Sequence, residues 1–214
     1  PLLGMYMVAE SYQGLLPPVA NQPHVVLAVL AATIVTIGIS IALRAPNSIT
    51  LALIGAATGG LLGDGIRPDW EHVGFVLGMA AIAPITGTLV ARSIPYDAFQ
   101  PRSTGARKVF GVGKLRWPAL ITILFSYSLN DGQKMLFVVA LVVGISVQAA
   151  AMSVIVNIVV LGLFILGMLS GIRSAMGILS HGVARATPIT AVWSQISTSV
   201  TLVGGSLLGA PMSM

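Results

Sequence analysis

Long uncharged stretches alternate with short polar segments along the chain. Residues 25–43 contain no charged side chain. At about 1.5 Å per residue, a helix over this stretch would be nearly as long as the roughly 30 Å hydrocarbon core of a bilayer. The pattern therefore predicts a membrane-spanning helix. A second apolar stretch, from His72 to Ala91, predicts another span with a kink at Pro84.

The stretch between these two spans is different in kind. Residues 45–63 carry no charge, but they begin with Ala45-Pro46-Asn47-Ser48 and contain several glycines. Because proline and glycine weaken a continuous helix, we expect a broken or re-entrant segment here, within a first membrane region over residues 1–91. A short polar turn from Asp64 to Glu71 separates this segment from the second span.

A basic segment follows at residues 92–116, with six Lys or Arg side chains. Loops rich in Lys and Arg remain on the cytoplasmic side of a membrane, so we interpret this segment as a cytoplasmic connector. It precedes a second membrane region over 117–214. The neutral run 135–172 is too long for one crossing, and we expect it to turn near 144–148.

The rest of the second region contains one more connector and a last span. Arg173, His181 and Arg185 mark the connector, and an apolar segment rich in Ser, Thr and Gly follows from Thr187 to Met214. Small hydroxylic residues allow helices to pack closely. We interpret Ser194, Gln195 and Ser197 as helix-packing residues, and the alternative is that they face a cavity.

Composition supports a membrane location. The chain is 56% hydrophobic and 8% charged, with a mean hydropathy of +0.94, whereas roughly a quarter of the residues in a soluble domain are charged. We therefore predict an all-α, polytopic transmembrane helix bundle with broken or re-entrant helices. We expect it in the cytoplasmic membrane of a bacterium, with the lipid bilayer as a partner.

Several function classes are disfavoured by the sequence. Without cysteine, the chain has no thiol chemistry, and His24, His72 and His181 fall near the ends of spans, without the spacing of metal ligands. The net charge of +5 comes largely from the basic connector, so it does not indicate nucleic-acid binding. Motifs for ATP binding, dinucleotide binding or a nucleophile elbow are missing, and we expect no enzymatic activity.

The most informative polar cluster runs from Ser126 to Lys134, between apolar stretches. Ionisable groups at membrane depth usually line a cavity or an ion path. Asp131 offers carboxylate oxygens to a cation, and Asn130 and Gln133 offer amide groups. Lys134 could attract a phosphate or neutralise Asp131, and the glycine between them could interrupt the helix. The alternative is that residues 130–134 form a loop at the membrane surface.

Two similar short stretches supply further polar groups. Ala45-Pro46-Asn47-Ser48 and Ala210-Pro211-Met212-Ser213 each follow an apolar stretch of helical length, as in transporters built from inverted repeats. A helix that begins near Ser48 would offer hydroxyl groups and free N–H groups to an anion. The alternative is that Ser48 or Asn47 simply caps this helix, and Ser213 has the same two interpretations.

Asn130-Asp131-Gly132-Gln133-Lys134 resembles the Asn-Asp-Gly-Gln-Lys core of the second signature motif of the inorganic phosphate transporter family, the PiT-type permeases. The two Pro- and Ser-containing stretches look like the hairpins of that family. Tyr127-Ser128 stands where the family usually has His-Gly. The family's first Asn-Asp motif would lie before Pro1 and the end of its second hairpin after Met214, so we expect this chain to be part of a longer protein.

The resemblance implies secondary active transport of inorganic phosphate between two inverted repeats, coupled to sodium or protons and without another cofactor. It implies that Ser48, Thr50, Asn130 and Ser213 bind phosphate and that Asp131, with Asn130, binds the cation. Gln133 and Lys134 would be their neighbours, and a homodimer is possible.

Two other functions remain open from the residues. One is a permease for another oxyanion such as sulfate, because tetrahedral anions require similar hydroxyl and backbone donors. The other is a membrane scaffold subunit with no translocation path. A transporter needs the Asp131 carboxylate, whereas a scaffold would tolerate asparagine at this position.

Overall fold

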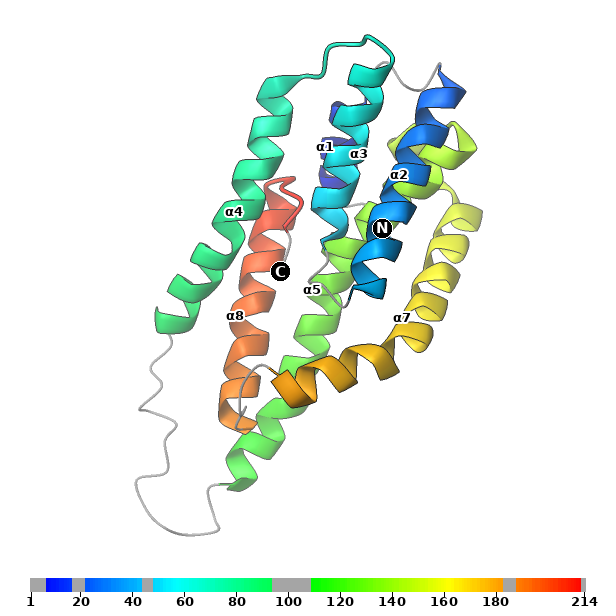
Figure 1. Ribbon diagram of the computed structural model, residues 1–214. Coiled ribbons are helices and arrows are strands. Elements are labelled where there is room, and N and C mark those ends of the chain that lie inside the picture. Colours follow the sequence, from blue (N-terminus) through cyan, green and yellow to red (C-terminus); the bar gives the residue numbers. More distant parts are fainter. Residues whose placement is uncertain (1–6, 17–21, 44–47, 94–108, 183–187, 213–214) are drawn as a thin grey trace.

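The computed structural model describes residues 7–16, 22–43, 48–93, 109–182 and 188–212. Within these residues the chain is all-helical (Figure 1). The helices are α1 (Met7–Leu15), α2 (Pro23–Ala42), α3 (Ile49–Gly63), α4 (Trp70–Ser93), α5 (Val109–Val143), α6 (Val147–Met152), α7 (Val154–Gly182) and α8 (Pro188–Leu207).

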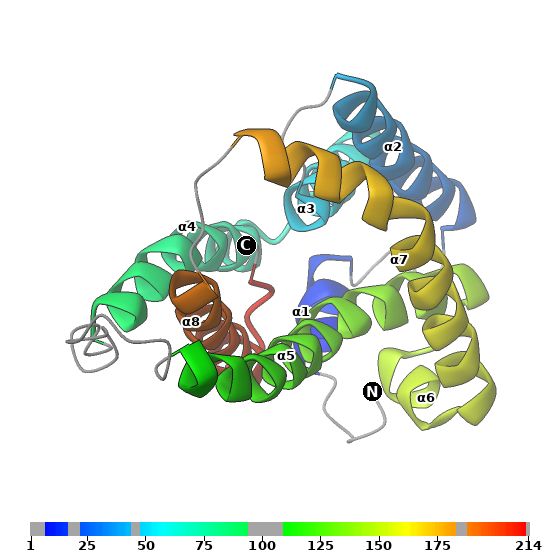
Figure 2. The same cartoon turned by 90° about the horizontal axis from the view of Figure 1, so that it is seen from below.

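The short helix α1 lies at the centre of the packed core. It contacts α3, α4, α5, α6 and α8, and Figure 2 shows it enclosed by longer helices. Val8, Ala9 and Tyr12 are fully buried. The Tyr12 ring stacks on that of Phe137 in α5, with the ring centroids 5.4 Å apart. Helix α1 thus joins the N-terminal helices to α5.

Helices α2 and α3 form an antiparallel pair. The Nε2 atom of His24, at the start of α2, is 2.9 Å from the Asp64 carboxylate at the end of α3. Gly60 allows close approach of the two helices, because a Cβ atom at this position would lie 2.8 Å from Val29. Gly65, with φ +73°, then turns the chain toward α4.

Two residues fix the start of helix α4: Asp69, which caps the helix, and His72, which bonds to α1. Asp69 Oδ1 accepts hydrogen bonds from the backbone N–H groups of Glu71 and His72, which caps the helix. The His72 ring donates to the Ser11 carbonyl at 2.6 Å and so connects α4 to α1. The helix then continues through Pro84 to Ser93.

The long helix α5 runs the length of the bundle and packs against α8, α1, α7 and α6. Helix α8 packs against both α5 and α4. After α8, Gly209 has φ +68°, and the Ala210 N–H donates to the Gly205 carbonyl at 2.8 Å. This turn directs residues 210–212, all of them buried, back into the bundle.

The structure confirms several predicted elements. The stretches 25–43 and 72–91 lie in α2 and α4, which are long and apolar enough to cross a membrane. The predicted turn near 144–148 separates α5 from α6, where Gly144 has φ +74° and Ser146 caps α6. The inverted-repeat relation of the two regions remains a prediction.

Other predictions about helix ends were wrong. The glycines do not break residues 49–63, which form one helix, and α5 continues through Gly132, so the alternative of a loop at 130–134 is wrong. A glycine costs only about 1 kcal/mol in a helix, and an apolar segment keeps its backbone hydrogen bonds within the helix where no water is present to replace them. The re-entrant position of segment 45–63 in the membrane stays a prediction. Residues 109–116 belong to α5 rather than to a connector, and Arg173 and His181 belong to α7.

We expect Gly60→Val to destabilise the protein by about 1–3 kcal/mol, because the new side chain would overlap Val29 between α2 and α3. Gly59→Val is the matched control. It makes the same change in helix propensity, but a Cβ atom there meets nothing within 4 Å. Thermal unfolding of both variants in detergent tests the expectation. Equal melting temperatures would contradict the close contact of α2 with α3.

Candidate functional site

Helix α5 carries a buried polar face in its middle. Ser126, Asn130, Gln133 and Lys134 are each at most 4% exposed. They are three or four residues apart, or adjacent, so they share one side of the helix. This side faces α1 and the segment that follows α8. The sequence therefore places four polar side chains where an apolar core would otherwise be.

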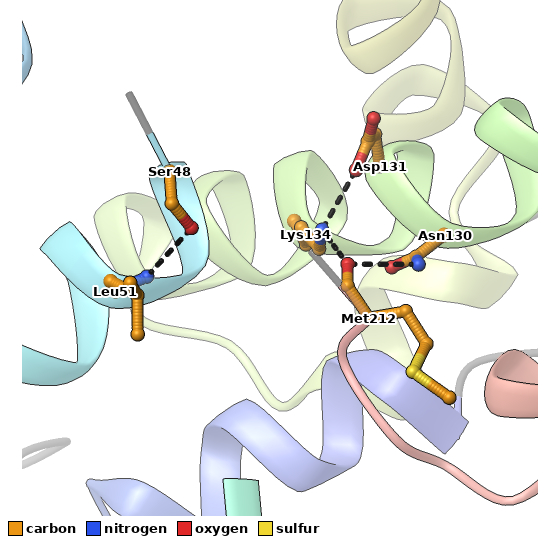
Figure 3. A network of polar contacts seen from close by, with 6 residues as sticks. All are labelled: Ser48, Leu51, Asn130, Asp131, Lys134 and Met212. Atoms are coloured by element: carbon orange, nitrogen blue, oxygen red, sulfur yellow. Dashed lines mark hydrogen bonds and ion pairs between the residues drawn. The ribbon is translucent and has the colours of Figure 1, made fainter. Parts of the chain in front are cut away.

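Lys134 is held by two oxygen atoms. Its Nζ atom donates to Asp131 Oδ1 at 2.8 Å and to the Met212 carbonyl at 2.8 Å (Figure 3). Asn130 Nδ2 donates to the same carbonyl at 3.1 Å. Residue 212 is far along the chain, so these bonds tie the last described segment to the centre of α5.

The Asp131–Lys134 pair is asymmetric in its surroundings. The Lys134 side chain is 5% exposed, whereas that of Asp131 is 33% exposed. A buried ammonium without a partner would be strongly destabilising, and the carboxylate and the carbonyl together compensate its charge. The sequence suggested that Lys134 either attracts a phosphate or neutralises Asp131. In this structure Lys134 forms an ion pair with Asp131.

Four buried polar atoms near this pair have no hydrogen-bond partner within the described part of the chain. Three of them can donate: the Tyr12 hydroxyl, the Thr50 hydroxyl and Gln133 Nε2. The fourth, Asn130 Oδ1, can only accept. Each unpaired buried group costs about 1–3 kcal/mol. Such a cluster is a feature of sites that complete their hydrogen bonds with a ligand.

Contacts between helices bring the three donors to one junction. The Gln133 side-chain oxygen accepts from the Val8 N–H at 2.9 Å, and one turn further along both helices Tyr12 stacks on Phe137. The hydroxyls of Tyr12 and Thr50 face each other, although neither completes a hydrogen bond. Helices α1, α3 and α5 therefore each contribute one unpaired donor.

The start of α3 appears with the Asp131–Lys134 pair in the close view of Figure 3. Ser48 caps α3, and its hydroxyl accepts from the Leu51 N–H at 3.3 Å. The helix-cap interpretation of Ser48 is thus confirmed. Thr50, in the first turn, is 1% exposed and is one of the unpaired donors.

The other predicted site residues have different outcomes. Asn130, Asp131, Gln133 and Lys134 lie together on α5, as the motif suggested. Ser213 lies outside the described residues. Its neighbour Met212 accepts the bonds from Asn130 and Lys134, so the Ala210–Met212 stretch reaches the site.

Two features of the site were not predicted from the sequence. Tyr12 is spaced three or four residues from Val8 and Leu15, a pattern that by itself predicts only an apolar helix face. A search for hydroxyl-bearing aromatic residues on such faces could have found it. The second feature is the backbone carbonyl of Met212, and an apolar methionine side chain gives no indication that the carbonyl of the same residue accepts hydrogen bonds.

The described residues contain no cluster of three or more His, Asp or Glu side chains that could hold a metal ion. Comparisons with protein-family models, curated proteins and solved structures give no match for this chain. The assignment of a function therefore rests on the residues and their geometry.

We expect Gly205→Val to displace the Met212 segment, because a Cβ atom there overlaps Met212 Cγ and lies 2.7 Å from its Cε. Without the carbonyl, Lys134 should become severalfold more reactive toward a water-soluble acetylating reagent, as measured by mass spectrometry. Gly204→Val is the matched control, since a Cβ atom there meets nothing within 4 Å. Unchanged Lys134 reactivity in the Gly205 variant would show that Met212 does not cover this side chain.

Proposed function

We propose that this chain forms part of a multi-pass membrane transporter for an inorganic oxyanion, with phosphate as its substrate and sodium or protons as the coupling ion. The observation that carries the proposal is the junction of α1, α3 and α5. Three buried, unpaired donors lie there beside a charged pair in the middle of an apolar bundle.

The distribution of apolar side chains supports a membrane location. In the most apolar 18-residue stretch of α2, only 17% is buried within the bundle, and the same share is buried in α4. Side chains such as Leu27, Ile34 and Ile41 are more than half exposed. Lipid is the solvent that suits such a surface. A bacterial cytoplasmic membrane and inverted repeats are part of the proposal.

The unpaired donors suit an anion with several oxygen atoms. Two hydroxyls and one amide N–H₂ group from different helices can converge on a tetrahedral ion. Lys134, on the same face of α5 as Gln133, adds a positive charge that strengthens such hydrogen bonds. The five-residue resemblance to phosphate transporters agrees with this chemistry.

Phosphate fits better than sulfate because of the one unpaired acceptor. Asn130 Oδ1 can accept a hydrogen bond from the P–OH group of hydrogen phosphate. Sulfate has no hydrogen at neutral pH and would leave this acceptor buried and unpaired. A site with buried hydrogen-bonding groups rejects an analogue that cannot pair with them.

The position of Lys134 suggests how anion and cation are coupled. Its ammonium now holds Asp131 Oδ1 and the Met212 carbonyl, two oxygens that also suit a sodium ion. If Lys134 turns to a bound phosphate, both oxygens become free for the cation. Binding of each ion then favours binding of the other, as a symporter requires.

We expect the full-length protein in liposomes to take up radiolabelled phosphate when a sodium or proton gradient is imposed. Asp131→Asn should lower gradient-driven uptake at least tenfold, because it removes the negative charge that the cation needs. Asp69→Asn, an exposed aspartate between α3 and α4, is the control and should keep wild-type uptake. Full uptake by the Asp131 variant would argue against the proposed cation site and favour the scaffold alternative. Faster uptake of sulfate than of phosphate by the wild-type protein would make sulfate the substrate.

We expect Thr50→Val and Tyr12→Phe each to raise the KM for phosphate about tenfold, since each removes one hydrogen bond to a charged ligand and keeps the shape of the side chain. Thr33→Val is the matched control, because the buried Thr33 hydroxyl donates to the Val29 carbonyl within α2. Initial uptake rates over a range of phosphate concentrations give the result. A KM changed equally in all three variants would argue against direct contact with phosphate.

A further inference from the structure

A cavity with several polar lining residues lies between α4 and α8, apart from the central junction. Its volume is about 510 Å³, and the residues that line it include Thr88 and Arg92 from α4 with Ser194, Ser197 and Thr198 from α8. Arg92 is the one charged side chain among its lining residues. Because none of the described residues that line the cavity is acidic, the Arg92 charge favours an anion there.

Several donors in this cavity are available. Arg92 and Ser194 are exposed and Thr198 is half-buried, and within the described part of the chain their side chains have no hydrogen-bond partner. Thr88 and Ser197, in contrast, donate to backbone carbonyls of their own helices. A planar guanidinium beside free hydroxyls matches the oxygen atoms of a tetrahedral oxyanion.

Of the two helices that line this cavity, only α4 has a helix end beside it. The last turn of α4 disfavours negative charge, whereas the lining residues of α8 lie beyond its first turn, where the helix dipole has little effect. Arg92 lies in the last turn of α4 and offsets the partial negative charge of that helix end. The hydroxyls of Ser194 and Thr198 come from α8.

Helix α8 connects this cavity to the central site. Ser194, Ser197, Thr201 and Gly205 are spaced three or four residues apart and therefore follow one face of the helix. Gly205 packs against Met212, whose carbonyl bonds Asn130 and Lys134. The rise from residue 194 to residue 205 is about 16 Å, roughly half of a bilayer core.

We propose that the cavity between α4 and α8 is a peripheral oxyanion site, from which the anion reaches the central junction along this face of α8. The identity of the anion as phosphate rests on the proposed function, whereas the existence of the site does not. A lipid phosphate headgroup has the same chemistry as the free ion, so the test separates these two sources.

The test uses a single thiol, since this chain has no cysteine of its own. Ser194→Cys is introduced into the full-length protein, with any cysteine outside this chain removed. Its rate of modification by a water-soluble thiol reagent is measured in detergent with and without inorganic phosphate. We expect millimolar phosphate to slow the reaction at least threefold, and to have no effect on Ser170→Cys, an exposed position on α7.

Additional variants connect the protection to Arg92. Arg92→Gln should abolish it, whereas Arg67→Gln, which removes an exposed arginine at the other end of α4, should not. Protection that persists in Asp131→Asn would support a site separate from the central one. If transport fails but this protection holds, the proposed function is wrong and the peripheral site stands.

Three results would overturn the proposal. The first is a modification rate that phosphate does not change. The second is protection that is the same with and without Arg92. The third is protection that requires phosphatidylglycerol in the micelle and is not given by inorganic phosphate, which would assign the cavity to a lipid headgroup.

Discussion

The organisation of this bundle depends on how one buried ammonium is compensated. Lys134 lies in the middle of α5, where an uncompensated charge would be unfavourable enough to prevent tight packing. Asp131 supplies the opposite charge from the same helix, but the second oxygen comes from Met212, after α8. The Lys134 ammonium is therefore further stabilised when the last segment folds back through the turn at Gly209. Local electrostatics thus favour a long-range feature of the fold.

Helix α1 has the complementary role. It is short, yet it fills the centre of the bundle and presents apolar side chains to the helices around it. Its Val8 N–H, near the helix start, is satisfied by the side chain of Gln133 rather than by water. The same helix brings Tyr12 to Thr50. Apolar packing and the polar site are therefore positioned by one element, so a change that displaces α1 would affect both.

The parts of the structure that sequence patterns could predict are those that depend on local composition. The helices α2 and α4, the turn after α5 and the polar group at 130–134 all follow from runs of similar residues. The continuity of α3 was missed because, in an apolar environment, the backbone hydrogen bonds of the helix outweigh the local cost of about 1 kcal/mol for each glycine. The contribution of Tyr12 was missed for a different reason, since its partners lie on α3 and α5.

One ligand of Lys134 is a backbone carbonyl, and this has a consequence for how such a site can evolve. Any amino acid at position 212 provides the same oxygen atom, so selection would act weakly on the side chain there. The constraint would instead fall on Gly205, where a larger residue would collide with the returning segment. Distant relatives could therefore retain the ligand while their sequences around it diverge, and a small residue in the last turn of α8 would be its most durable sign.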